Sequence, residues 1–250
     1  MKKILLFAAV ACLSIGSLFA QNKFKGTINY TLTSTGETEF QIPDQIKNAE
    51  LKVYESKVLA SSPIFLMNYG GMASNILVDG RKQYICMELS QIFMYLSAND
   101  VELDYKGSSK ILVSDEITQS EIDSLTIPVT EGFYIEYVSG ETKTIAGKTA
   151  KKAVMHAFDE DGEDHPTTFW YCDEIGPEVN IIFNGIKGVA LEYSMTIGEG
   201  RQITLTATEI KEGKVKEVDV LLPDGFESIT KDQFTALFKQ INEEMQYLQE

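Results

Sequence analysis

The chain has 250 residues, of which 44% are hydrophobic, and its 37 acidic and 22 basic side chains give a net charge of −15. Such an acidic surface repels the phosphates of nucleic acids and the head groups of anionic lipids, so the composition argues against a nucleic-acid-binding protein. The length is sufficient to bury a sizeable hydrophobic core without disulfides or metals holding the fold together.

A secretory signal peptide is predicted at the N-terminus. Two lysines precede the short apolar run of residues 4–18, and the small residue Ala20 follows it. This order is typical of a leader that is cleaved after export. We therefore expect a signal peptide at residues 1–20 and a mature, exported chain of residues 21–250 that forms one domain. Acylation at Cys12 is the less favoured alternative, because the apolar run continues past that residue.

Alternation of apolar and polar residues predicts most of the strands, since every second side chain of a strand faces the same way. Asp79 and Gly80 lie between two such runs and predict a hairpin with a type I′ turn. From residue 98 to residue 130 the pattern weakens, and Thr118 with Glu121 resembles the capping box of a short helix. The predicted strands are residues 24–33, 51–58, 75–78, 81–89, 92–97, 133–138, 142–146, 149–158, 167–172, 189–197, 203–208 and 214–222.

A long amphipathic helix is predicted at the C-terminus. Thr230 and Gln233 have the spacing of a capping box, which marks the start of a helix. Apolar residues then recur at intervals of three and four, which places them on one helical face. These residues are Phe234, Leu237, Phe238, Ile241, Met245 and Leu248. About ten strands and one such helix predict a mainly β, α+β fold, in which the helix packs on a curved antiparallel sheet.

The second half of the chain carries four short motifs, which are residues 143–153, 169–175, 183–192 and 222–226. In this order they resemble exported domains of unknown function related to the GLPGLI group of Gram-negative bacteria. Lys187 stands where the motif that names the group has proline. The resemblance covers residues 142–226 well and the first strand weakly. It implies a periplasmic domain similar to the half-barrel of lipoprotein carriers such as LolA, without assigned catalytic residues; association with the outer membrane is the alternative.

The sharpest cluster of polar residues follows the predicted strand 149–158. Asp159, Asp161, Asp164 and His165 could supply oxygen and nitrogen ligands to a cation, but the stretch lacks the third early ligand and the distant glutamate of a calcium loop. A solvated turn is therefore favoured. His156 shares a strand face with apolar neighbours, which favours a packed or edge histidine over a catalytic base.

Two cysteines remain after the predicted leader is removed. Cys86 and Cys172 both lie in predicted strands. An exported protein can form a disulfide, but only if the two residues meet. Two buried thiols are favoured over a disulfide.

The candidate ligand site is marked by apolar residues that follow neither the periodicity of a helix nor that of a strand. Residues 92–96 are an uninterrupted apolar run, and residues 169–172 place apolar groups on both faces of one strand. A strand of this kind must be covered on both faces, either by ordinary core beneath the C-terminal helix or by a ligand. The candidate ligand-binding residues are Phe65, Met67, Tyr69, Met72, Phe93, Tyr95 and Trp170.

These patterns favour non-catalytic binding of an apolar or amphipathic ligand, such as a lipid or a lipoprotein acyl chain, in the concavity of the sheet. A cell-envelope module that binds a protein partner is the alternative. The sequence contains no recognised nucleophile elbow, zinc motif or phosphate-binding loop. We therefore expect no enzyme, no catalytic residue, no metal and no cofactor.

Overall fold

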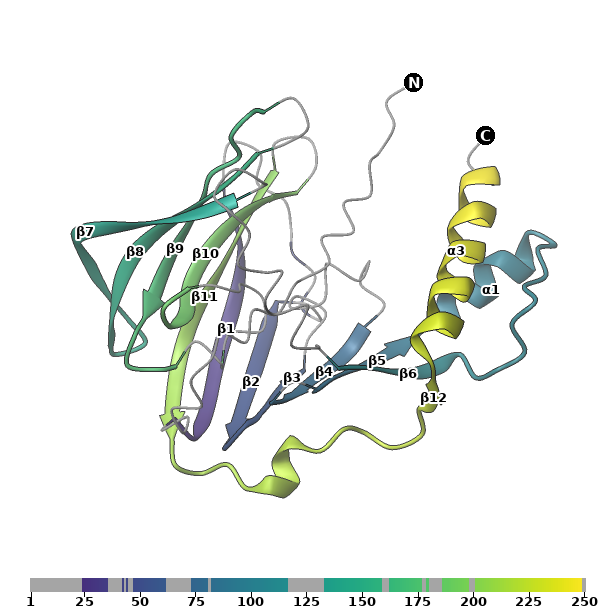
Figure 1. Cartoon of the computed structure of the whole chain (residues 1–250), viewed down its shortest axis with the longest axis horizontal. Helices are drawn as coiled ribbons and strands as arrows, with labels where there is room; N and C mark the ends of the chain where they lie inside the picture. Colours follow the sequence, from purple (N-terminus) through teal and green to yellow (C-terminus); the bar gives the residue numbers. More distant parts are fainter. Residues whose placement is uncertain are drawn as a thin grey trace.

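The computed structural model describes residues 24–35, 42, 44, 47–61, 73–80, 82–116, 133–158, 162–176, 179, 186–197 and 201–248. Twelve strands form one open, curved sheet, with helices at one end of it (Figure 1). The elements are β1 (Gly26–Thr35), β2 (Asn48–Tyr54), β3 (Lys57–Ser61), β4 (Ala73–Asp79), β5 (Lys82–Glu88), α1 (Ser90–Ala98), β6 (Lys110–Glu116), β7 (Phe133–Ile145), β8 (Lys148–Ala157), β9 (Thr167–Cys172), β10 (Val189–Ile197), β11 (Arg201–Glu212), the 3₁₀ helix η3 (Glu217–Val220), β12 (Glu227–Ile229) and α3 (Lys231–Tyr247).

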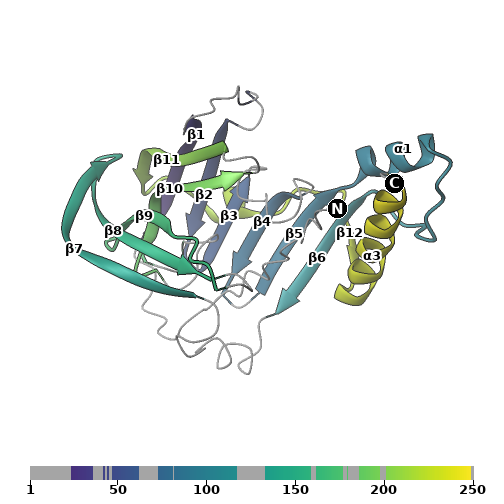
Figure 2. The same cartoon turned by 90° about the horizontal axis from the view of Figure 1, so that it is seen from above.

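Strand β1 lies near the middle of the sheet. The strand order is β12-β6-β5-β4-β3-β2-β1-β11-β10-β9-β8-β7, so one antiparallel meander extends from β1 on each side. Among the described strands, only β12 is parallel to its neighbour, β6. The two edges are β7 and β12, which lie far apart in both views (Figures 1 and 2).

The two faces of the sheet differ in polarity because apolar and polar residues alternate along the strands. In β1, Ile28, Tyr30 and Leu32 are buried, and the paired strand β11 buries Leu205 opposite Leu32. We call this side the apolar face. The intervening side chains, such as Thr33 and its cross-strand partner Thr204, lie on the other side, which we call the polar face.

The C-terminal helix α3 begins at the predicted capping box. The Thr230 hydroxyl accepts a hydrogen bond from the Gln233 amide at 3.2 Å, and the Gln233 side chain accepts one from the Thr230 amide at 2.9 Å. Leu237 and Ile241 are buried and belong to the same core as the apolar face. The predicted fold class is confirmed: the protein is mainly β, with a curved sheet and a C-terminal amphipathic helix.

Residues 213–226 connect β11 to β12 along the outside of the sheet (Figure 1). Val215 and Val220 pack against Leu59 and Leu77 in a small second core. Since Val58 and Val78 belong to the main core, Leu59 and Leu77 lie on the polar face. The predicted strand 214–222 is therefore wrong: it contains η3, and it packs on the sheet through Val215, Val220 and Leu222.

The predicted strand 92–97 is also wrong, because these residues lie in helix α1. Leu96 is the buried residue of this helix, whereas Met94 and Tyr95 are exposed. An unbroken apolar run has neither the period of a helix nor that of a strand, so its sequence does not distinguish the two.

Other predicted boundaries differ in detail. Residues 51–58 span the end of β2 and the start of β3, with a turn at Glu55, whose φ is 55°. Residues 133–138 and 142–146 belong mainly to one strand, β7, which is interrupted by a bulge near Gly140. The β4–β5 hairpin is confirmed, with Gly80 at φ 60°. Strands β6 and β12 were not predicted, and Thr118 with Glu121 lies outside the described residues.

Candidate functional site

The predicted ligand-binding residues fall in separate places. Phe65, Met67, Tyr69 and Met72 lie outside the described residues. Phe93 and Tyr95 lie on α1, where the Phe93 ring is 6.1 Å from that of Tyr105 and Tyr95 is exposed. Trp170 lies on β9, toward the opposite end of the sheet (Figures 1 and 2). The structure therefore does not bring Trp170 together with Phe93 and Tyr95.

The apolar face forms one continuous core from β6 to β8. Representative buried side chains along this path are Ile111, Met87, Val58, Ile28, Leu205, Tyr193, Phe169 and Ala153. The Tyr30 hydroxyl donates a hydrogen bond to the Ala190 carbonyl at 2.9 Å. Burial raises the pKa of the Tyr30 phenol, so that it stays protonated as this donor. Within the described residues, α1 and α3 lie at the β6–β12 end and leave the rest of this face without a helix over it.

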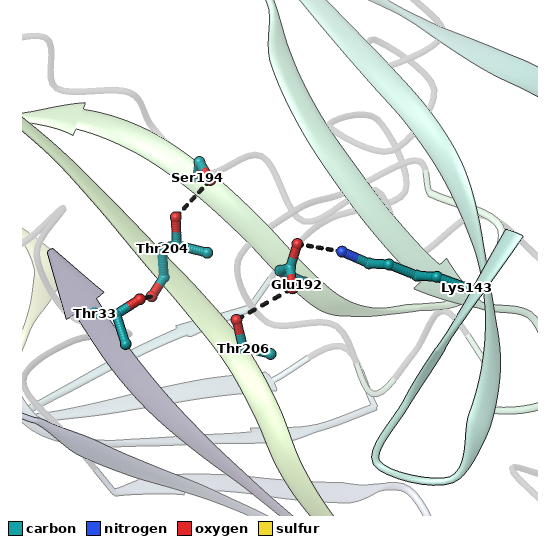
Figure 3. A network of polar contacts seen from close by, with 6 residues as sticks. All are labelled: Thr33, Lys143, Glu192, Ser194, Thr204 and Thr206. Carbon is teal, nitrogen blue, oxygen red and sulfur yellow. Dashed lines mark hydrogen bonds and ion pairs between the residues drawn. The ribbon is translucent and has the colours of Figure 1, made fainter. Parts of the chain in front are cut away.

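The polar face carries two groups of hydrogen-bonded charged and hydroxyl side chains (Figure 3). The Lys143 ammonium lies 2.5 Å from Glu192 Oε1 and 4.3 Å from the centre of the Trp170 ring. Thr206 donates a hydrogen bond to Glu192 Oε2 at 3.3 Å. The Ser194 and Thr204 hydroxyls are 2.7 Å apart, and Thr33 donates to the Thr204 carbonyl at 3.3 Å.

The group of Lys143, Glu192 and Thr206, which we call the polar network, links strands that are not neighbours. Lys143 belongs to β7 and Glu192 to β10, with β8 and β9 between them in the sheet. Strand β7 also contacts β11, which shows how strongly this end of the sheet curls. The network therefore stabilises the curl, and Trp170 contributes its ring as a partner for the Lys143 cation.

We expect a double-mutant cycle of Lys143→Met and Glu192→Gln to give a coupling energy of about 1 kcal/mol, since this partly exposed ion pair is supported by a second hydrogen bond. Urea unfolding of the four proteins measures the coupling. The pair Lys239 and Glu243 on α3, whose charged atoms are 3.8 Å apart on an exposed surface, is the control. A coupling no larger than that of this control would contradict the structural role of the network.

His156 lies on β8 between two carboxylates. Its Nδ1 is 2.6 Å from Asp164 Oδ2, and its Nε2 is 3.4 Å from Glu136 Oε2. The Tyr134 ring stacks on the imidazole, with the ring centres 4.5 Å apart. The hydrogen bond to Asp164 raises the pKa of His156, Glu136 adds to this rise, and desolvation opposes it. His156 thus ties the β7–β8 hairpin to the segment containing Asp164.

We expect this histidine to stabilise the protein most in mild acid. A raised folded-state pKa means that the stabilisation is complete below the unfolded pKa, about 6.5, and is lost as pH rises through the higher folded pKa. The difference in unfolding free energy between the natural protein and His156→Gln should therefore be larger at about pH 5.5 than at about pH 8.5. Denaturant unfolding at both pH values checks this, and a difference that grows with pH would contradict it.

The other candidate polar residues form no further site in the described part of the chain. Asp159 and Asp161 lie outside it, so the alternative of a cation at that turn remains untested. No group of three potential metal ligands is found among the described residues. Cys86 and Cys172 are buried free thiols, as favoured, and burial raises the pKa of Cys86 to about 11.

Comparisons with known proteins give only distant similarities. No protein family matches the chain, and no curated protein matches it. The crystal structure of MucB is 12% identical, covers 82% of this chain and has a TM-score of 0.37. The crystal structure of MucB in complex with MucA(peri) is 9% identical, covers 81% of this chain and has a TM-score of 0.32. A LolA-superfamily protein from Nitrosomonas europaea is 10% identical over 82% of this chain and 92% of its own, with a TM-score of 0.27.

These similarities do not define a ligand or a partner. The matched part spans 59% of the MucB chain and 56% of the MucB chain in the complex. The relation to the GLPGLI group stays a prediction, since no family matches. Among the described residues, no helix has the length and apolarity that a membrane span requires.

Proposed function

We propose that this protein is an exported, periplasmic, non-catalytic binding protein for an apolar or amphipathic ligand, such as a lipid or the acyl chain of a lipoprotein. One observation carries the proposal: the apolar face is continuous from β6 to β8 in a sheet that does not close, and the described helices lie at only one end of it. Those two helices lie over only part of this face, whose side chains are buried within the chain.

Burial of hydrocarbon would drive the binding. Removing an apolar chain from water contributes about 0.8 kcal/mol per methylene group, so an acyl chain gains enough to bind without a charged contact. The acidic surface disfavours adsorption of the protein to anionic lipid head groups. The apolar part of the ligand is then the part that the protein recognises.

Native mass spectrometry of the protein purified from its own envelope tests the proposal. We expect a bound mass that an organic extract releases as a lipid. A chain without bound mass, together with no uptake of a fluorescent fatty acid added in excess, would overturn the proposal. The second measurement detects a weak ligand that is lost during purification.

Variants at the candidate residues make the test specific. Met67→Asp combined with Phe93→Asp should abolish uptake of the fluorescent fatty acid while secretion persists. The matched control is Met94→Asp, since Met94 is the residue after Phe93 on α1 and is 64% exposed. Uptake that is unchanged in the double variant would exclude these residues from the site.

A protein-interaction module of the cell envelope is the second candidate. Helix α1 contains no charged residue, and it exposes Met94 and Tyr95, while α3 exposes Tyr247. Exposed apolar side chains of this kind are typical of surfaces that contact another protein. A photo-crosslinking residue at position 95 should then capture one defined envelope protein, whereas the same residue at Thr208, on the polar face of β11, should not.

A further inference from the structure

Strand β7 is an unusually long edge of the sheet. It has 13 residues, and within the described part of the chain it pairs with β8 alone. An edge strand presents unpaired amide and carbonyl groups along its open side, and proteins usually protect such an edge with charges, proline or a bulge. The bulge of β7 lies between Tyr137 and Thr142, so it leaves residues 133–137 as a regular edge.

The sequence of this regular edge favours pairing. Residues 133–137 are three aromatic residues, one isoleucine and one glutamate, and aromatic and β-branched residues have high strand propensity. Glu136 is the one charged residue among them. The edge therefore lacks most of the protection that a strand of this composition needs against another strand.

The side chains around this edge define which partner it suits. Tyr134 and Glu136 point to the polar face, where the exposed Phe158 ring is 6.2 Å from that of Tyr134. Asp164 adds a second carboxylate beside them through its contact with His156. Ile135 and Tyr137 point to the other face, are half-buried and pack against the core.

We propose that residues 133–137 of β7 bind, by strand addition, an extended segment of a partner protein in which basic and apolar residues alternate. A lysine or arginine beside Glu136 forms a cross-strand ion pair, and one beside Tyr134 contacts the ring face. Apolar residues of the segment then continue the face that contains Ile135. Main-chain hydrogen bonds supply the affinity, and these alternate side chains supply the specificity.

The charge of the protein favours a different chain over a second copy of itself. Each copy carries a net charge of −15, so two copies repel each other, whereas a basic segment is attracted. Of the nearby lysines, Lys152 pairs with Glu141 and Lys151 with Asp173. Lys187 lies over the Tyr137 ring, 4.3 Å from its centre, and not beside Glu136. The inference does not depend on the proposed apolar ligand, because that ligand would bind to the apolar face of the sheet and not to the edge strand.

A peptide of seven residues that alternates lysine and valine serves as the probe, and the peptide that alternates glutamate and valine is its control. With the full mature chain, we expect the lysine peptide to bind and to slow amide hydrogen exchange in residues 133–137 by about tenfold. The glutamate peptide should not bind. Equal binding of both peptides, or binding without protection of β7, would overturn the proposal.

Charge reversal separates strand addition at this edge from general attraction to an acidic protein. Glu136→Lys should weaken binding of the lysine peptide by about tenfold, since it replaces a cross-strand ion pair with a repulsion. Glu243→Lys on α3 changes the net charge equally and should leave the affinity within about twofold, because it lies far from β7. Equal losses in both variants would contradict the proposal, as would dimers that protect β7 without peptide.

Discussion

Replacing Phe169 by alanine is expected to lower the free energy of unfolding by about 3–5 kcal/mol. Phe169 is fully buried on the apolar face of β9, where its cross-strand neighbours are Ala153 of β8 and Tyr193 of β10. Its ring centre is 6.3 Å from that of Tyr193. The substitution reduces the buried apolar area. It also leaves a cavity in the core between two paired neighbours, β8 and β10.

Denaturant unfolding measures this loss, and Thr168→Ala is the matched control. Thr168 precedes Phe169 on the same strand and is exposed on the polar face. Its substitution should change the free energy of unfolding by less than about 0.5 kcal/mol. Similar losses in the two variants would contradict the assignment of the apolar and polar faces of β9.

The second large effect is expected at a glycine. Gly188→Ala should cost about 3 kcal/mol, because the added Cβ would lie 2.0 Å from the Cys172 carbonyl oxygen and 2.8 Å from the Asp173 Cα. Both are backbone atoms at the end of β9, so they cannot move without disturbing its pairing with β10. Close approach of two strands at this position thus requires glycine.

Gly140→Ala is the control for this prediction. Gly140 has φ 82°, but a Cβ there would meet no atom within 4 Å, so its substitution costs backbone strain alone, about 1 kcal/mol. Thermal or denaturant unfolding compares the two variants. A larger loss for Gly140→Ala would show that strain at the bulge of β7, and not the β9–β10 contact, is the tighter constraint.

The sequence predicts an element well where one side of it is buried and the other is exposed to solvent. Strands β1 and β11 and helix α3 have this arrangement, and each was predicted close to its observed position. Helix α1 was assigned to a strand because residues 92–96 are uniformly apolar, and its helical form depends on the contact of Leu96 with the core. Strand β12 has three residues, and its pairing with β6 is what makes it a strand.

The candidate site was harder to predict, because it depends on the curvature of the sheet. Trp170 was predicted as a ligand-binding residue, and the sequence did not indicate that its ring centre lies 4.3 Å from the Lys143 ammonium. Lys143 and Glu192 are 49 positions apart, and no local pattern predicts that a curled sheet brings them together. His156 was expected to be a packed or edge histidine, and the sequence did not indicate that its second carboxylate, Glu136, comes from β7.

The central position of β1 has a consequence for how the chain folds as it is synthesised. Its neighbours are β2, which follows directly, and β11, which is far along the chain: Asn29 and Glu209 are hydrogen-bonded at a separation of 180 residues. Contacts between residues this far apart in the sequence make folding slow, and β1 stays an unpaired edge until β11 has been synthesised. During that interval, β11 of another copy can take the same place. Domain-swapped dimers are therefore the expected misassembled product when this protein is overproduced.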